Sequence, residues 1–138
     1  MTLNQELIRT RCQEISDSVG RLEKIGNAPK EEFLENQDAK DIASYRLLVA
    51  IEAALGICYH ISAKHFKKVP EKYSECFALL EDARIISADL SENLQKMAGF
   101  RNLLVHMYWK VDYEAVYQII RNNLKDLRRF AEVAAGLV

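Results

Sequence analysis

The segment from residue 38 to residue 66 constrains the fold most, because a helix there carries apolar residues on two opposite sides. The two stripes consist of Tyr45, Leu48, Val49, Leu55 and Tyr59 on one side, and of Leu47, Ile51, Ala54, Cys58 and Ile61 on the other. A helix that is apolar nearly all round is buried nearly all round. The neighbouring helices of a small bundle cover only part of such a surface. The pattern therefore predicts a homodimer, in which a second copy of the chain covers the rest.

Apolar residues at three- and four-residue steps predict four more helices in the chain. The expected ranges are 3–25, 70–86, 90–108 and 113–135. Three polar groups are expected to begin helices: Thr2 with Gln5, Asp89 with Glu92, and Asp112. The predicted architecture is an all-α, antiparallel up-and-down bundle of four long helices and a shorter one, in which residues 1–138 form one domain.

The composition limits the classes of function. The formal net charge is −1, so any binding of nucleic acid must come from a local patch rather than from overall attraction. The N-terminus has no apolar leader, and no stretch approaches roughly eighteen apolar residues, which predicts a cytoplasmic protein without a membrane span. Cys12, Cys58 and Cys76 are odd in number and lack paired spacing, so we expect reduced thiols rather than disulfides or a zinc site.

Arg101 is expected in the middle of an apolar stripe. On a helical wheel its neighbours within about 60° are Leu94, Met97, Leu104, Val105 and Tyr108. Glu52 has a similar apolar setting on the helix of residues 38–66. An unpaired buried charge is strongly destabilising, so each of the two needs a partner. Two interpretations stay open: a structural ion pair between Arg101 and Glu52, or an arginine kept in a cleft for an anionic ligand, with Glu52 orienting it.

Three polar residues follow or flank this arginine. Asn102 and His106 are four residues apart and adjacent on a helix, so Asn102 can hold the imidazole ring, although a lone helical histidine is more often solvated or part of a core. Arg101 and His106 are about 140° apart on a continuous helix, so they act on one substrate only if the helix loosens or a second subunit contributes. Tyr108 lies about 20° from Arg101 on the wheel, so its hydroxyl is expected to face the same cleft or to cap the apolar stripe.

A basic turn, KHFKKVPEK, offers a second group of candidates. Lys64, Lys67 and Lys68 are candidates for binding RNA phosphates, with an ordinary solvated loop as the alternative. His60 and His65 lack the i, i+4 spacing of a metal site, so no metal is expected. The sequence has no glycine-rich phosphate loop and no serine or cysteine nucleophile motif, and no cofactor is expected.

The run RNLLVHMY resembles the R-x-x-x-x-H-x-Y motif of HepT toxins, within the HEPN superfamily of helical domains. The segments AIEAALGICYHISAKH and VDYEAVYQIIRNNLKDLRRF resemble the same proteins, so the likeness covers most of the chain. Gly56 and Tyr59 depart from it, since many relatives carry polar residues there.

The resemblance implies a HEPN-like fold and a metal-independent, dimeric endoribonuclease whose paired motifs face each other across the interface. In this chain Arg101 would bind the scissile phosphate, His106 would act as general acid and base, and Asn102 would orient His106. Attack by the RNA 2′-hydroxyl would leave a cyclic phosphate and a 5′-hydroxyl.

HepT toxins are neutralised by MntA, a minimal nucleotidyltransferase that adds AMP to the motif tyrosine, which is Tyr108 here. The resemblance therefore implies a toxin with an MntA-like antitoxin as its partner. Two alternatives remain: a non-catalytic HEPN partner that binds a nucleotidyltransferase or a nucleotide, and a bundle in which these polar residues are purely structural. The joint presence of Arg101, Asn102 and His106 favours the ribonuclease.

Overall fold

The computed structural model describes residues 2–138, and every regular element in that range is helical. In chain order these are α1 (Gln5–Ile25), α2 (Lys30–Glu35), α3 (Gln37–Ile61), the π-helical turn η1 (Ser62–Phe66), α4 (Tyr73–Asp82), α5 (Ala88–His106), the 3-10 turn η2 (Tyr108–Lys110), α6 (Tyr113–Asn122) and α7 (Leu124–Gly136). The predicted all-α class is confirmed.

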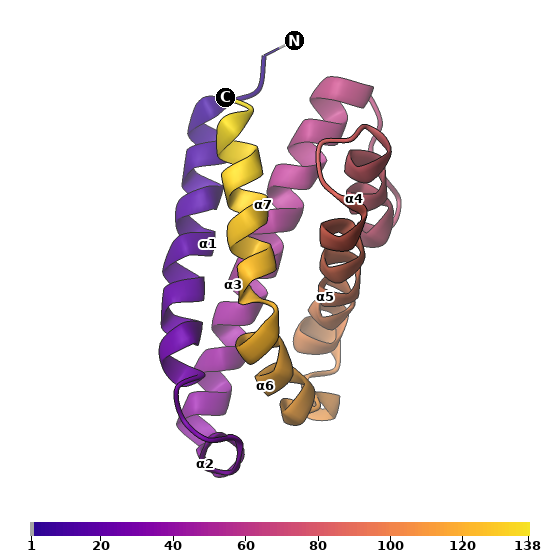
Figure 1. The fold of residues 1–138 in the computed structure, drawn as a ribbon. Coiled ribbons are helices and arrows are strands. Elements are labelled where there is room, and N and C mark those ends of the chain that lie inside the picture. Colours follow the sequence, from indigo (N-terminus) through magenta and orange to yellow (C-terminus); the bar gives the residue numbers. More distant parts are fainter. Residues whose placement is uncertain (1) are drawn as a thin grey trace.

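Helix α3 is the central element of the bundle. It packs against α1 and α7 on one side and against α4 and α5 on the other (Figure 1). The first residues of α1 and the last of α7 lie at one end of the bundle, whereas α2 and α6 lie at the other (Figure 1). Large side chains from all these layers are fully buried, among them Ile15, Leu47, Ile57, Phe77 and Phe130. The ring of Phe77 on α4 meets that of Phe130 on α7 edge-on, at 5.6 Å between centroids, so the core is continuous from one layer to the other.

The two apolar stripes of α3 differ in their burial. The stripe that contains Leu47, Ile51 and Ile61 is buried in the core. On the other stripe Tyr45 is 61% exposed, and the neighbouring Ile42 is 45% exposed. The helix is therefore not buried nearly all round by its own chain, and an apolar surface is left free, as the homodimer prediction requires.

The length and composition of α3 also match those of a membrane span. Its continuous helix with η1, Gln37–Phe66, has a window of mean hydropathy 1.5, and half of that window is buried inside the bundle. Core helices of soluble proteins commonly reach such values, because they are apolar on the faces that their neighbours cover.

The predicted helix caps are partly wrong. The side chain of Asn4, not Thr2, accepts the hydrogen bond from the Leu7 amide at 3.1 Å. Ser87 rather than Asp89 accepts one from the Leu90 amide at 3.2 Å. An N-cap must be the last residue in extended conformation, and the sequence offers a capping side chain at several adjacent positions. The Asp112 cap is confirmed, because its carboxylate accepts from the backbone amide of Glu114 at 3.0 Å.

Several predicted helix boundaries also need correction. The helix expected over 70–86 is shorter, Tyr73–Asp82, and a short helix, Lys30–Glu35, lies in the acidic connector. The expected last helix is broken at Asn123, whose φ of −121° lies outside the helical range. Most important for the site, α5 ends at His106, because Met107 has φ −138° and ψ 44°.

Candidate active site

Arg101 on α5 and Glu52 on α3 form an ion pair. The Arg101 Nε donates to Glu52 Oε1 at 2.6 Å. The Arg101 side chain is 21% exposed and that of Glu52 is 45% exposed, so the expectation of two buried charges is wrong. The hydrogen bond to Glu52 raises the pKa of Arg101, which therefore remains a cation with part of its surface free for an anion.

Two further residues hold the guanidinium. Its Cζ lies 5.0 Å from the ring centroid of Tyr73, the first residue of α4. Its Nη1 donates to the Asn102 side-chain oxygen at 3.4 Å. The Tyr73 ring in turn meets Tyr59 of α3 edge-on, with centroids 6.2 Å apart. Arg101 is thus fixed in one direction by a carboxylate, in another by an amide, and across its plane by an aromatic ring.

The sequence reasoning missed Tyr73. It follows the basic turn and carries no motif, and its contact with Arg101 depends on how the start of α4 docks against α5. Tyr59, which departs from the family pattern, packs on Tyr73 rather than pairing with a charge. Together the two rings form an aromatic support beside Arg101.

His106 is the last residue of α5, and its side chain is exposed. No hydrogen bond involving its imidazole is found among residues 2–138. Asn102 bonds to Arg101 in this structure, so its role in orienting His106 stays a prediction. Since the helix is continuous from Arg101 to His106, the two side chains leave it about 140° apart. The helix does not loosen between them, so of the two conditions set by the sequence only the contribution of a second subunit stays a prediction.

Tyr108 lies outside α5, in the turn η2. The prediction that its hydroxyl faces the cleft of Arg101 assumed a continuous helix, and that assumption is wrong because the backbone turns at Met107. The direction of the hydroxyl stays a prediction. Tyr108 is 68% exposed and Trp109 is 66% exposed, and their rings meet edge-on at 5.4 Å between centroids. Tyr108 is therefore largely open to solvent in the single chain.

We call the exposed large apolar residues of α3, α5 and η2 the aromatic face. Its members are Ile42 and Tyr45 of α3, Val105 of α5, and Tyr108 and Trp109 of η2. A hydrogen bond of 3.2 Å between Ser44 and Tyr113 ties the first half of α3 to the start of α6, directly after η2. Exposed apolar side chains that form one contiguous patch on a protein mark an interaction surface.

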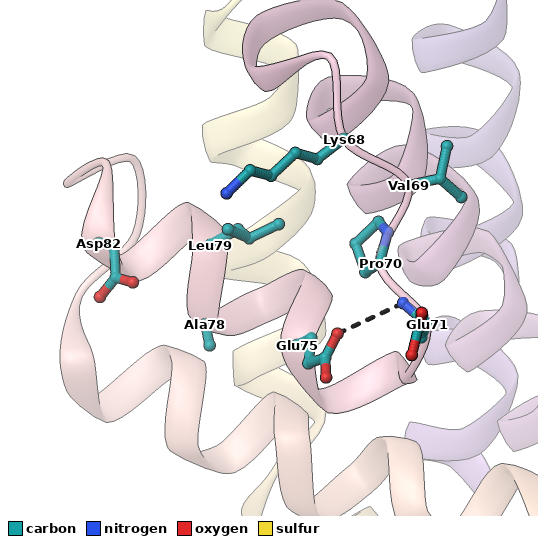
Figure 2. Close-up of a pocket in the computed structure, with 8 residues that line it drawn as sticks. All are labelled: Lys68, Val69, Pro70, Glu71, Glu75, Ala78, Leu79 and Asp82. Carbon is teal, nitrogen blue, oxygen red and sulfur yellow. Dashed lines mark hydrogen bonds between the residues drawn. The ribbon is translucent and has the colours of Figure 1, made fainter.

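The lysines of the basic turn lie in η1 and in the loop that leads to α4. Lys64 belongs to η1, and Lys67 adopts a left-handed conformation with φ 52° that turns the chain toward α4. Lys68 extends from the loop toward Leu79 over a hollow of about 450 Å³ (Figure 2). The walls of this hollow carry the carboxylates of Glu71, Glu75 and Asp82, so a phosphate gains little there. The proposed contact of these lysines with RNA stays a prediction.

The other titratable groups have structural settings. His60 accepts a hydrogen bond from the backbone amide of Asn4 at 2.9 Å. Burial, together with Lys64, lowers the pKa of His60 and keeps it neutral, as that acceptor role requires. Cys12, Cys58 and Cys76 are free thiols. Within residues 2–138 no group of three or more histidine, cysteine, aspartate or glutamate side chains is arranged to hold a metal ion.

Comparison with known proteins gives a consistent result. A family model described as ribonuclease HepT-like matches residues 15–134. The mRNA nuclease HepT of Shewanella oneidensis is 26% identical over 128 residues, which cover 93% of this chain and 96% of that protein. The tRNA nuclease HepT of Aphanizomenon flos-aquae is 28% identical over 116 residues, covering 83% and 78%.

A solved structure shares the fold. The tri-AMPylated HEPN toxin of Shewanella oneidensis, in complex with an MNT antitoxin, superposes with a TM-score of 0.83 at 26% identity. The match covers 92% of this chain and 95% of that one. The fold described above is therefore shared with that toxin.

Proposed function

The chain belongs to the HepT-like ribonuclease family, and we propose that it is the toxin of a toxin–antitoxin pair, an endoribonuclease that cleaves RNA without a metal ion. The observation that carries this proposal is the setting of Arg101. Its charge is fixed on three sides by Glu52, Tyr73 and Asn102, and yet 21% of its side chain faces solvent. The three contacts hold the charge in place and leave one side of it open to an anion.

The remaining donors of Arg101 suit a phosphate. A guanidinium has five N–H groups, of which one is used on Glu52 and one on Asn102. The rest are free to donate to the two non-bridging oxygens of a phosphodiester. Charge builds on these oxygens as the 2′-oxygen attacks, so a cation held in place beforehand stabilises the transition state more than the ground state.

The proton transfers fall to His106. In the proposed reaction a neutral imidazole takes the proton of the 2′-hydroxyl as the bond from the 2′-oxygen to phosphorus forms. An imidazolium gives a proton to the 5′-oxygen as the bond from phosphorus to that oxygen breaks. The products are a 2′,3′-cyclic phosphate and a 5′-hydroxyl. A base and an acid are needed at once on opposite sides of the phosphorus, which two copies of His106 from two subunits would supply.

The aromatic face supports the proposed homodimer. It lies on α3 and at the end of α5, beside the residues of the motif. If its residues on α3 and α5, Ile42, Tyr45 and Val105, meet their own copies about a two-fold axis while Tyr108 stays outside the contact, the two α5 ends approach each other. Arg101 of one subunit and His106 of the other can then contact one phosphate, which removes the conflict set by their separation of about 140° on a single helix.

We further propose that a nucleotidyltransferase antitoxin controls the enzyme through Tyr108, in the cytoplasm, where RNA and ATP are both present. The exposure of the Tyr108 ring, 68%, is what such a modification requires. Each AMP would add bulk and a negative phosphate two residues from His106. RNA would then be excluded by occupancy and by repulsion, without unfolding of the bundle.

The test is expression of the chain with and without its nucleotidyltransferase, with growth and RNA integrity as the readouts. Wild-type chain alone should arrest growth and degrade RNA, and the partner should prevent both. The His106→Ala chain alone should neither arrest growth nor degrade RNA. Because the His106 side chain is exposed, this substitution should leave the fold intact. Growth arrest that persists in His106→Ala would instead support a non-catalytic partner role.

A further inference from the structure

A hollow of about 340 Å³ lies beside Arg101, between the start of α4 and the middle of α5. Its wall includes Lys72, Tyr73 and Ser74 from the α4 side and Gln95, Gly99 and Asn102 from α5. The volume is at the small end of ligand-binding sites, which run from roughly 300 to 1,000 Å³. It suits one nucleotide unit rather than a longer segment.

Two wall residues join this hollow to the proposed phosphate site. The Tyr73 ring supports the Arg101 guanidinium at 5.0 Å, and the Asn102 side-chain oxygen accepts from Arg101 at 3.4 Å. Tyr73 and Asn102 therefore each border the hollow and contact Arg101, so a group in the hollow would lie next to a phosphate bound to Arg101. In an RNA chain the group at that position is the base or ribose attached to that phosphate.

The chemistry of the wall favours a base over a second phosphate. Asn102, Gln95 and Ser74 present neutral donors and acceptors, which match the edge of a nucleobase. The Gln95 amide nitrogen is used on Ser91 at 2.9 Å, which leaves its oxygen to accept from a base. Glu71 and Lys72, also in the wall, offset each other in charge, so a second phosphate gains little there. The Glu71 carboxylate can accept from an exocyclic amine or a ribose hydroxyl.

Gly99 keeps the hollow open. A β-carbon built at Gly99 meets no atom within 4 Å, so the space beside it is empty and not filled by neighbouring side chains. Glycine in the interior of a helix lowers stability by about 1 kcal/mol relative to alanine. The space that Gly99 leaves beside the hollow is a functional reason for a glycine at this position.

From these observations we propose that the hollow between α4 and α5 is a subsite for the nucleobase next to the scissile phosphate. The inference rests on the proposed ribonuclease function and names where its substrate is recognised. Gly99 acts as the opening of the subsite, and Gln95 and Ser74 contact the edge of the base. Phosphate binding and proton transfer remain with Arg101 and His106.

The experiment fills the hollow by substitutions in the protein and, in parallel, removes the base from the RNA substrate. Gly99→Leu, Ser74→Leu and wild type are compared on a short single-stranded RNA with one cleaved linkage, and on the same RNA with an abasic ribose on either side of that linkage. Filling the hollow should raise KM about tenfold with kcat little changed, because it removes a contact to the substrate away from the reacting atoms. Replacing the intact RNA by the abasic RNA should raise the KM of wild type by a similar factor. The same replacement should not raise the KM of the filled variants further.

Gly20→Leu is the matched control, since Gly20 is also inside a long helix with no atom within 4 Å of an added β-carbon. Circular dichroism establishes that each variant is folded, and Ser74→Leu fills the hollow from α4 should Gly99→Leu disturb α5. If wild type cleaves RNA but both filled variants keep their KM, the subsite is wrong while the ribonuclease proposal stands. If wild type neither cleaves nor binds the RNA, the ribonuclease proposal fails and the subsite with it. The subsite is also wrong if a filled variant raises KM over wild type by the same factor on abasic RNA as on intact RNA.

Discussion

The Nε of Arg101 donates to the Glu52 carboxylate at 2.6 Å, and this contact joins two helices whose paired residues are 49 positions apart in the chain. The pair is open to solvent on both partners, with 21% and 45% of the side chains exposed. Exposed ion pairs add little to stability, about 0–1 kcal/mol. The value of this one is therefore expected to lie in the direction it gives to the guanidinium.

Glu52→Ala should accordingly reduce RNA cleavage about tenfold or more while it lowers the free energy of unfolding by less than about 1 kcal/mol. Glu52→Gln, which retains an acceptor at the same place, should recover part of the activity. The measurements are kcat on a defined RNA and urea unfolding of the same samples. The control is Glu92→Ala, which removes an exposed pair with Lys96 on the same α5 and should change neither quantity. A large loss of stability with unchanged kcat per folded molecule would restore the purely structural interpretation of the pair.

Acidification should weaken the fold through His60. Its pKa is lowered in the folded chain by burial and by Lys64, so the unfolded chain binds more protons between the lowered value and the ordinary one of about 6.5. The contribution of His60 to the free energy of unfolding is then fully present above about pH 6.5 and is lost as the pH drops below that value. His60→Gln should flatten this part of the curve, measured as urea midpoints from pH 7.5 to pH 5. His65→Gln, in the exposed turn, is the control and should leave the slope as in wild type.

The sequence predicted the helical class and the long helices well, because apolar periodicity over twenty residues leaves few alternatives. The prediction failed where a single residue determines the end of a helix. Met107 ends α5 and moves Tyr108 off the helix, although Met107 is a good helix former. The contact of Tyr73 with Arg101 also escaped, since it depends on how α4 docks and not on any local pattern. Motif residues were thus identified from the sequence, but their directions were not.

The aromatic face gives a direct test of the homodimer. Tyr45→Arg places a charge in the middle of this face, where 61% of the tyrosine is exposed in the single chain. Loss of a central aromatic contact should weaken dimerisation about thirtyfold or more, corresponding to a hot-spot loss of about 2 kcal/mol. Light scattering over a concentration series measures it, and RNA cleavage should fall with the dimer fraction. Val69→Arg, at a residue that is 78% exposed but outside the face, should leave assembly and activity unchanged. Wild type that is monomeric at micromolar concentration would contradict the proposed shared site.

Control through Tyr108 predicts a separation of activity from regulation. Tyr108 stands in a turn with its ring 68% exposed and outside the contacts that hold Arg101, so removal of its hydroxyl should leave cleavage within about twofold of wild type. Co-expression with the nucleotidyltransferase should add one or more AMP masses to the wild-type Tyr108 peptide and none to Tyr108→Phe, as read by mass spectrometry. Tyr45→Phe removes the hydroxyl of another exposed tyrosine and should still be modified at Tyr108. Because the added phosphate acts only where it is attached, the Tyr108→Phe toxin should resist neutralisation and arrest growth even with the partner present. Equal silencing of both proteins would mean that the partner acts by binding, and the modification would then not be the means of control.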